Sequence, residues 1–193
     1  WSGWGKVSSA RAVTRLISAT NETYQKVDFV LFTGVAGGIE NGLSQWDIVI
    51  SSAVIQHDMD ARPLFKKFEI PALKKSKLFA NNEFVIAAEQ TLRKSINSKF
   101  LKVFGDVKVG LIGTGDSFVS DITQVQRLKN EINDLCAVEM EGAAVAQVAE
   151  QEKIPWLVIR VISDNSDDTA ADNFTEFLEK YKNYSFYLLE DTI

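Results

Sequence analysis

Short runs of mainly β-branched residues alternate along the chain with longer stretches in which apolar residues recur at helical spacing. The alternating period predicts strands interleaved with helices. The predicted strands are 27–32, 47–54, 107–113, 137–140 and 156–162. The predicted helices are 6–19, 81–96, 121–132, 142–151 and 174–189. This order favours an α/β fold, with a mixed, largely parallel sheet flanked by helices.

Cap residues and breakers refine the boundaries of these elements. Asn82 and Asp121 are predicted N-caps, because a short polar side chain there accepts hydrogen bonds from the first helical N–H groups. Residues 33–38 contain three glycines and are predicted to form a loop that stops the first strand. Residues 58–80 carry two prolines and five lysines, so we predict irregular structure there.

Composition narrows the class of protein. The 193 residues carry 21 basic and 26 acidic side chains, a net charge of −5, which argues against general nucleic-acid binding. Apolar runs fall far short of the roughly 20 residues that cross a bilayer. One cysteine (Cys136) excludes an internal disulfide, and one histidine (His57) excludes most histidine-based zinc sites. We predict a single domain over 1–193, in the cytoplasm and without a membrane partner.

Polar residues and glycines collect where the predicted strands end. Asp116 follows the third strand, Glu139 and Glu141 end the fourth, and Asp164 ends the fifth. Ligands of open α/β sheets bind beyond the carboxyl ends of strands, so these residues favour a site for a polar, planar small molecule. The alternative is that strand ends are polar in any protein and that glycines merely turn the chain.

Two glutamates flank Met140 where a strand passes into a helix. In an extended backbone, Glu139 and Glu141 point to the same side. Like charges so placed are unfavourable unless ligand hydroxyls, water or a cation lie between them. A ribose offers two adjacent hydroxyls that one carboxylate can bind. A helix-capping role explains one of the two glutamates but not both.

Four segments together resemble a known enzyme family: TGVAGG at 33–38, GTGDSF at 113–118, VEMEGAA at 138–144 and RVISD at 160–164. They look like the 5′-methylthioadenosine/S-adenosylhomocysteine nucleosidases of the purine nucleoside phosphorylase superfamily, and the resemblance covers essentially the whole chain. It implies a nucleoside phosphorylase-like fold. It also implies hydrolysis of the N-glycosidic bond, without metal or organic cofactor, to adenine and a 5-thio-substituted ribose.

The resemblance implies roles for single residues. Asp164 is expected to protonate N7 of adenine, Phe118 to stack on the base, and Glu141 to hold the ribose hydroxyls. Glu139 and Arg160 are expected to position the attacking water. The other residues implied to bind substrate are Gly37, Val119, Val138, Met140, Ser163, Phe174 and Leu64. A homodimer is also implied, in which segment 58–70 lies across the 5′-alkylthio pocket of the partner.

Two departures from the family pattern leave alternatives open. The water-activating glutamate of the family lies in an N-terminal strand and loop that nothing here matches, so we expect that residues before Trp1 are absent from this sequence. Val35 stands where relatives often carry serine. Phosphorylases place an arginine and a serine at the positions of Phe32 and Val35, which favours water over phosphate as the nucleophile. The alternatives are a nucleoside phosphorylase and a non-catalytic nucleoside-binding protein.

Overall fold

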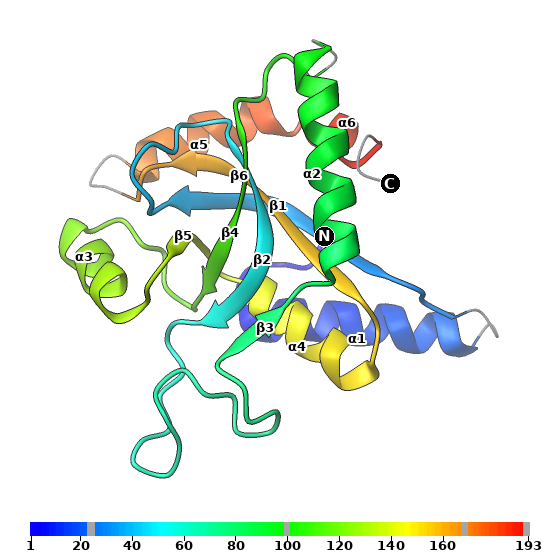
Figure 1. Ribbon diagram of the computed structural model, residues 1–193, viewed down its shortest axis with the longest axis vertical. Coiled ribbons are helices and arrows are strands. Elements are labelled where there is room, and N and C mark those ends of the chain that lie inside the picture. Colours follow the sequence, from blue (N-terminus) through cyan, green and yellow to red (C-terminus); the bar gives the residue numbers. More distant parts are fainter. Residues whose placement is uncertain (23–25, 99–100, 167–169, 191–193) are drawn as a thin grey trace.

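The computed structural model describes residues 1–22, 26–98, 101–166 and 170–190, and within them six strands form one sheet with helices packed around it (Figure 1). The strands are β1 (Val30–Gly38), β2 (Ile48–Gln56), β3 (Lys77–Phe79), β4 (Val107–Thr114), β5 (Leu135–Glu139) and β6 (Trp156–Asp164). The helices are α1 (Lys6–Glu22), α2 (Asn82–Asn97), α3 (Ile122–Glu131), α4 (Gly142–Glu152), α5 (Ala170–Tyr181) and α6 (Ser185–Glu190). The predicted α/β fold with a mixed sheet is confirmed.

The strand order brings the ends of three strands to one place. The order is β3-β2-β4-β5-β1-β6, and an additional pairing of β2 with β6 closes five strands into a ring. β1 runs parallel to β6 but meets β5 antiparallel, with Gly37 opposite both Val138 and Asp164. The last residues of β1 pair antiparallel with the last residues of β5. The carboxyl ends of β1, β5 and β6 therefore converge at Gly37.

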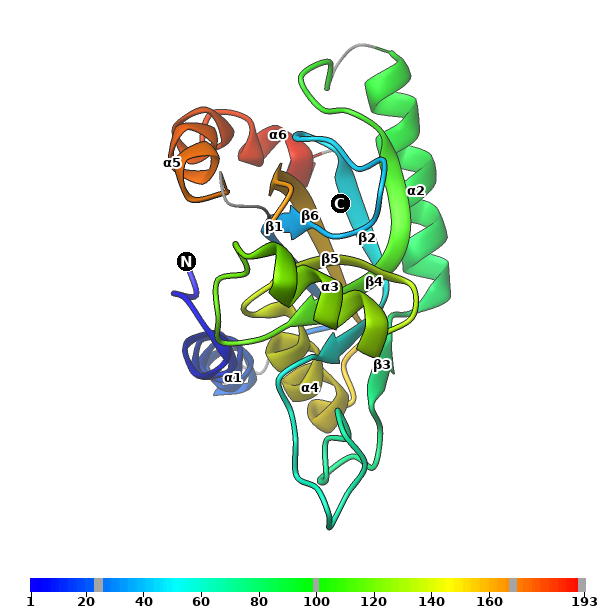
Figure 2. The ribbon, with the colours of Figure 1, turned by 90° about the vertical axis from the view of Figure 1, so that its left-hand side faces the viewer.

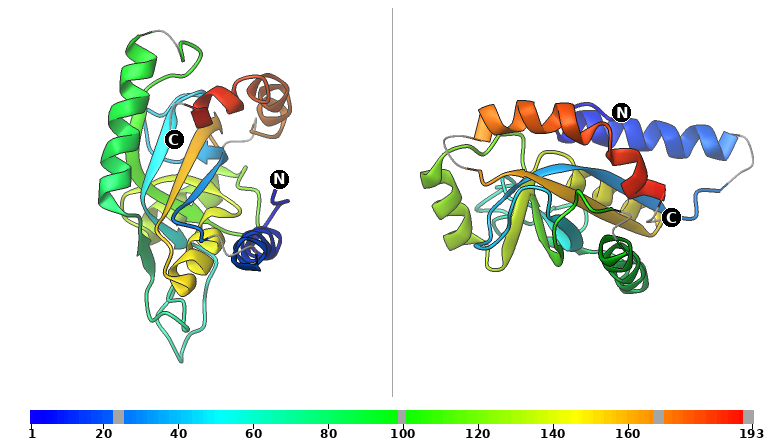
Figure 3. Two further views of the ribbon diagram at one scale, coloured as in Figure 1. Left: turned by 90° about the vertical axis from the view of Figure 1, so that its right-hand side faces the viewer. Right: turned by 90° about the horizontal axis from the view of Figure 1, so that it is seen from above.

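Helices cover both sides of the sheet (Figures 2 and 3). α1 packs on α4 through a small apolar cluster that includes Val13, Ile17 and Val145. α2 lies against β2 and β4 and buries Val85 and Leu92 in the largest aliphatic and aromatic cluster. Burying each such aliphatic side chain contributes about 1.5–3 kcal/mol, so this packing fixes the helices against the sheet. Every helix within the described ranges is too short or too polar to span a membrane.

The glycine-rich segment 33–38 is a strand, which corrects the loop predicted for it. β1 begins later than predicted, at Val30, and continues through Gly38. Its glycines allow close approach rather than a turn: a Cβ at Gly34 would overlap the guanidinium of Arg160, and a Cβ at Gly37 would overlap the hydroxyl of Ser166. The sequence pattern could not distinguish these two uses of glycine.

Two further boundaries differ from the prediction. The N-cap of α2 is Asn81, not Asn82, because Asn81 Oδ1 accepts the Glu83 N–H at 2.9 Å. The cap at Asp121 is confirmed, since its carboxylate accepts the Thr123 N–H at 2.8 Å. Within 58–80, residues 77–79 are not irregular but form β3, which pairs antiparallel with β2.

The predicted helix 174–189 is two helices, α5 and α6, separated by a turn at 182–184. Trp46 packs against Phe177 on α5 and against Tyr184 in the turn, with ring centroids 4.5 and 5.8 Å apart. These aromatic contacts draw the chain back over the sheet, and a continuous helix would carry Tyr184 past Trp46. α5 thereby stays over the end of β6, where it covers the site described next.

Candidate active site

A cavity of about 770 Å³ opens where β1, β5 and β6 converge on Gly37. Cavities of this size at strand ends are typical small-molecule sites. Eleven of the twelve predicted site residues line it: Gly37, Phe118, Val119, Val138, Glu139, Met140, Glu141, Arg160, Ser163, Asp164 and Phe174. The fold therefore brings together residues that are up to 137 positions apart in the sequence (174 minus 37).

Leu64 is the predicted residue that lies elsewhere. Its side chain is 84% exposed and belongs to the segment between β2 and β3, which extends away from the sheet (Figures 1 and 2). Leu64 is not part of the cavity wall formed by the described residues of its own chain.

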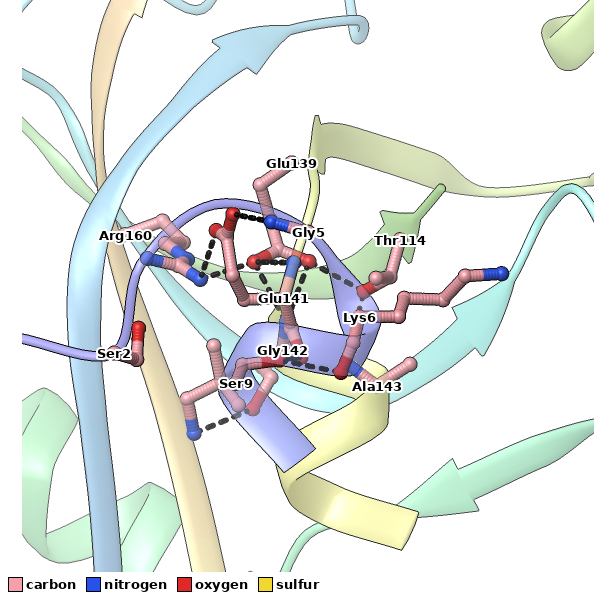
Figure 4. A network of polar contacts seen from close by, with 12 residues as sticks. Ser2, Gly5, Lys6, Ser9, Thr114, Glu139, Glu141, Gly142, Ala143 and Arg160 are labelled. Atoms are coloured by element: carbon pink, nitrogen blue, oxygen red, sulfur yellow. Dashed lines mark hydrogen bonds and ion pairs between the residues drawn. The ribbon is translucent and has the colours of Figure 1, made fainter. Parts of the chain in front are cut away.

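Arg160 contacts both Glu139, at the end of β5, and Glu141, directly before α4 (Figure 4). Its Nη2 forms an ion pair with Glu139 Oε2 and lies 3.4 Å from Glu141 Oε2. The side chains of Arg160 and Glu139 are only 3% and 2% exposed, so this is a buried ion pair. The expectation that Glu139 and Glu141 point to one side is confirmed, and a cation supplied by the chain itself separates them.

The carboxylate of Glu139, the last residue of β5, caps the start of α4 from outside the helix, whose N-cap residue is Glu141. The Gly142 N–H donates to both carboxylate oxygens of Glu139, at 2.7 and 2.9 Å, and the Thr114 hydroxyl donates to Oε1. Thr114 in turn accepts the N–H of Ala143 at 2.8 Å. The capping alternative is thus right for Glu139, while Glu141 makes no side-chain cap bond. The carboxylate of Glu139 is therefore occupied by contacts within the protein. Glu141 is the glutamate that can still bind a ligand.

Glu141 faces the cavity and is held from one side only. The Gly5 N–H donates to its Oε1 at 2.9 Å, and Arg160 lies near the other oxygen. Burial raises the pKa of the Glu141 carboxyl, Arg160 lowers this pKa, and the charge of Glu139 raises it further. A carboxylate in this position gains from hydroxyl donors that reach it from the cavity.

The first turn of α1 connects Glu141 to the turn that carries Phe118. Directly after Gly5, the Lys6 N–H donates to Asp116 Oδ1 at 2.8 Å. The Lys6 ammonium contacts Asp58 Oδ1 at 2.6 Å, and Asp58 Oδ2 accepts the Asp116 N–H at 3.0 Å. The start of α1 therefore contacts both Glu141 and the turn before Phe118; Figure 4 shows the contact with Glu141.

Asp164 lines the same cavity as Glu141 and is almost fully buried. The Ser163 hydroxyl lies 2.6 Å from Oδ2, and the Ser166 N–H donates to Oδ1 at 2.8 Å. Gln45 donates to the Ser163 carbonyl oxygen at 2.7 Å, which fixes this end of β6. The carboxyl group of Asp164 is therefore held in one orientation.

Three of the aromatic rings that border the cavity contact one another. Phe118 and Phe174 meet edge to face with centroids 5.5 Å apart, and Trp4 meets the other side of Phe174 at 5.8 Å. Phe118 is 38% exposed, which leaves ring surface available for a planar ligand. Stacking on such surfaces contributes about 0.5–1.5 kcal/mol beyond simple burial.

Comparison with known proteins places this geometry in a family. The sequence model of the Phosphorylase superfamily matches residues 2–193. The chain belongs to the Phosphorylase superfamily. A 5′-methylthioadenosine/S-adenosylhomocysteine nucleosidase of Bacillus cytotoxicus is 37% identical over 180 residues, 93% of this chain and 72% of the relative. The enzyme of the same name from Shewanella loihica is 37% identical over 186 residues, covering 95% and 75%.

Solved members of the superfamily share the fold. S-adenosylhomocysteine nucleosidase from Streptococcus pyogenes, in complex with 5-methylthiotubericidin, superposes with a TM-score of 0.86 at 30% identity, over 99% of this chain and 75% of that one. A 5′-methylthioadenosine/S-adenosylhomocysteine nucleosidase from Colwellia psychrerythraea, in complex with adenine, gives a TM-score of 0.86 at 34% identity, over 99% and 74%. This agreement confirms the nucleoside phosphorylase-like architecture.

In this superfamily member the cavity also contains residues that sequence reasoning missed. Trp4, Ser166 and Tyr181 line it, together with Leu178. Leu178 and Tyr181 follow Phe174 by four and seven positions, so helical spacing alone places them on the same face and could have found them. Burial raises the pKa of Tyr181 to about 12, so its hydroxyl keeps its proton. No sequence pattern marked Ser166, because its placement depends on the backbone turn after β6.

Proposed function

We propose that this chain hydrolyses the N-glycosidic bond of 5′-methylthioadenosine and S-adenosylhomocysteine, and that it releases adenine and a 5-thio-substituted ribose. The observation that carries the proposal is one cavity lined by two carboxyl groups, Asp164, which hydrogen bonds fix in place, and Glu141, which Gly5 and Arg160 hold in the cavity wall. Aromatic rings line the same cavity. The names of the relatives and the nucleoside analogues and adenine bound by similar structures support the same activity.

The two carboxyl groups suit the two halves of the reaction. N-glycosidic cleavage passes through a sugar with oxocarbenium character and a base that gains negative charge. Asp164 donates a proton to N7 of adenine, so that the base leaves as a neutral molecule. Glu141 binds the 2′- and 3′-hydroxyls of the ribose, and its negative charge stabilises the developing positive charge on the sugar.

Arg160 and Glu139 position the attacking water in this proposal. The buried ion pair fixes the guanidinium in the cavity wall. Arg160 Nε has no hydrogen-bond partner within the part of the chain that the structure describes, which leaves a donor for a bound water. A fixed donor of this kind lowers the barrier by holding the nucleophile in line with the bond that breaks.

A phosphorylase is the second candidate, and the surroundings of Arg160 argue against it. Phe32 packs on the guanidinium, with Cζ 4.6 Å from the ring centroid, and Val35 is the neighbouring apolar residue of β1 in the cavity wall. A phosphate dianion requires several hydrogen-bond donors and positive charge. Phe32 and Val35 supply neither, which supports water as the nucleophile.

Product analysis distinguishes the two candidates. The protein is incubated with 5′-methylthioadenosine in buffer with and without inorganic phosphate, and the products are separated by chromatography. We expect adenine and free 5-methylthioribose at equal rates in both buffers. Formation of a ribose 1-phosphate, or a requirement for phosphate, would assign the chain to the phosphorylases instead.

Glu141→Gln tests the ribose contact. The substitution keeps the size of the side chain but removes the charge, so the hydroxyl bonds lose about 1.5–3 kcal/mol of charge-assisted strength. We expect kcat/KM for 5′-methylthioadenosine to fall roughly 10- to 150-fold. The 2′-deoxy substrate should lose clearly less, because one of its two bonds is already missing. Equal losses for both substrates would place Glu141 away from the 2′-hydroxyl.

The proposal includes a homodimer. Leu64 and Phe65 are exposed on a segment that projects from the protein, and large apolar side chains on a projecting loop are typical of contact surfaces. Leu64 would then reach the 5′-alkylthio end of the partner's cavity. A location in the cytoplasm also remains a prediction.

Sedimentation at micromolar concentration checks the dimer. We expect a dimer for the natural chain and a shift toward monomer for Leu64→Asp, because a buried unpaired charge opposes association. Ile86→Asp is the matched control: Ile86 is 45% exposed on α2, away from the projecting segment, and its change should leave the dimer intact. A natural chain that sediments as a monomer rules out this part of the proposal.

A further inference from the structure

Ser166, which lies beside Asp164, has a strained backbone and a buried hydroxyl. It follows β6, has a left-handed backbone with φ of 55°, and its side chain is fully buried in the cavity wall. Non-glycine residues adopt this conformation at a cost of about 1–2 kcal/mol. Residues held in such conformations cluster at ligand-binding and catalytic sites, where the surrounding structure maintains them.

Within the described residues, the hydroxyl of Ser166 lacks a hydrogen bond. Its Oγ is buried and has no hydrogen-bond partner among the residues that the structure describes. A buried hydroxyl left unpaired costs about 1–3 kcal/mol, so such groups are rare without a ligand or water to satisfy them. The backbone N–H of the same residue is fully used, since it donates to Asp164 Oδ1 at 2.8 Å.

The position of the hydroxyl is defined by Gly37 and Asp164. A Cβ at Gly37 would overlap Ser166 Oγ and would lie 3.2 Å from Asp164 Oδ1. The hydroxyl and the carboxylate oxygen therefore lie beside the same glycine, and all three residues belong to the cavity wall. A side chain at position 37 would fill this space, so glycine keeps it open for both groups.

We propose that Ser166 Oγ accepts a hydrogen bond from the exocyclic 6-amino group of the adenine, which makes Ser166 a specificity-determining residue. The inference rests on the proposed function, in which Asp164 protonates N7. On the edge of a purine, N7 is flanked by a C8–H group and by the substituent at C6. Only the 6-substituent forms strong hydrogen bonds, so it is the partner available to a hydroxyl beside Asp164.

This hydrogen bond strengthens as the reaction proceeds. Protonation of N7 withdraws electrons from the ring and makes the 6-amino hydrogens more positive. A bond from a more positive donor is stronger, so Ser166 stabilises the transition state more than the bound substrate. We therefore expect its loss to lower kcat/KM about 3- to 10-fold, the effect of one hydrogen bond of ordinary net strength.

The test compares two substrates that differ only at C6. One is 5′-methylthioadenosine, and the other is the same nucleoside with hydrogen in place of the 6-amino group. Ser166→Ala keeps the Cβ and the N–H bond to Asp164 but removes the hydroxyl. We expect the 3- to 10-fold loss in kcat/KM with the 6-amino substrate and no loss with the 6-hydrogen substrate, which cannot make this bond.

A control and a second variant make the outcome decisive. Ser163→Ala removes the hydroxyl beside Asp164 Oδ2 and should lower kcat/KM for both substrates alike. Ser166→Gly removes the same hydroxyl and relieves the left-handed backbone, and it replaces Ser166→Ala if that variant fails to fold. Equal losses for both substrates, or no loss for either, would overturn the proposal. Failure of the natural chain to cleave 5′-methylthioadenosine would instead overturn the proposed function.

Discussion

Asp164→Asn lowers kcat for 5′-methylthioadenosine by about 10²- to 10⁴-fold, the range typical of a lost general acid. Asparagine has the same shape and can still accept the Ser166 N–H, so the end of β6 keeps its structure. It has no acidic proton to give to N7, and adenine would have to leave as an anion. The adenine affinity of the variant should change little, because the aromatic rings around the base are untouched.

Steady-state kinetics together with adenine titration measure the two quantities separately. The matched control is Asp121→Asn, the same chemical change at the N-cap of α3, where asparagine caps as well as aspartate does. This control should keep natural activity. An Asp164→Asn protein that retains most of its kcat would remove Asp164 from the mechanism.

Arg160→Met lowers the free energy of unfolding by about 3–5 kcal/mol, because it leaves the buried Glu139 carboxylate without its cation. The two side chains are 3% and 2% exposed, so water cannot replace the lost partner. Methionine fills similar space, which limits the contribution of a cavity. Urea unfolding at neutral pH measures the change.

The double variant Arg160→Met, Glu139→Gln is the control for this interpretation. Removing the second charge should restore a large part of the lost stability, since glutamine can still accept the Gly142 N–H at the start of α4. The cycle of single and double variants then gives the coupling of the pair. A loss below about 1 kcal/mol for Arg160→Met would show that the pair is not buried in solution.

The hydrophobic pattern predicted the elements well, because the helices bury one face and the central strands are continuous apolar runs that are buried on both faces. α1, α3, α4 and the strands β2, β4 and β6 lie within a few residues of their predicted bounds. Segment 33–38 was misassigned because its glycines serve contacts with Arg160 and Ser166 that come from β6 and its following turn. Such contacts depend on which strands pair, and strand pairing is not encoded in local periodicity.

In the candidate site, too, local sequence predicted some features, and others depend on tertiary contacts. The general rule for strand ends in α/β sheets indicated Glu139, Glu141 and Asp164, which share one cavity, whereas the family resemblance supplied residues such as Val119 and Phe174. The separate tasks of Glu139 and Glu141 could not be predicted, because they depend on where α4 begins. Leu64 fell outside the cavity wall because its segment folds outward. Ser166 was missed because its orientation depends on a left-handed turn that serine rarely adopts.

The stoichiometry of bond cleavage tests the proposed reaction most directly. Natural protein and the Asp164→Asn variant are incubated with 5′-methylthioadenosine in phosphate-free buffer, and adenine and reducing sugar are measured over time. The proposed mechanism predicts one adenine and one reducing sugar for each nucleoside consumed by the natural protein, and release at least about 100-fold slower with the variant. Natural protein that releases no adenine, or a variant that releases it equally fast, would contradict hydrolysis at this cavity.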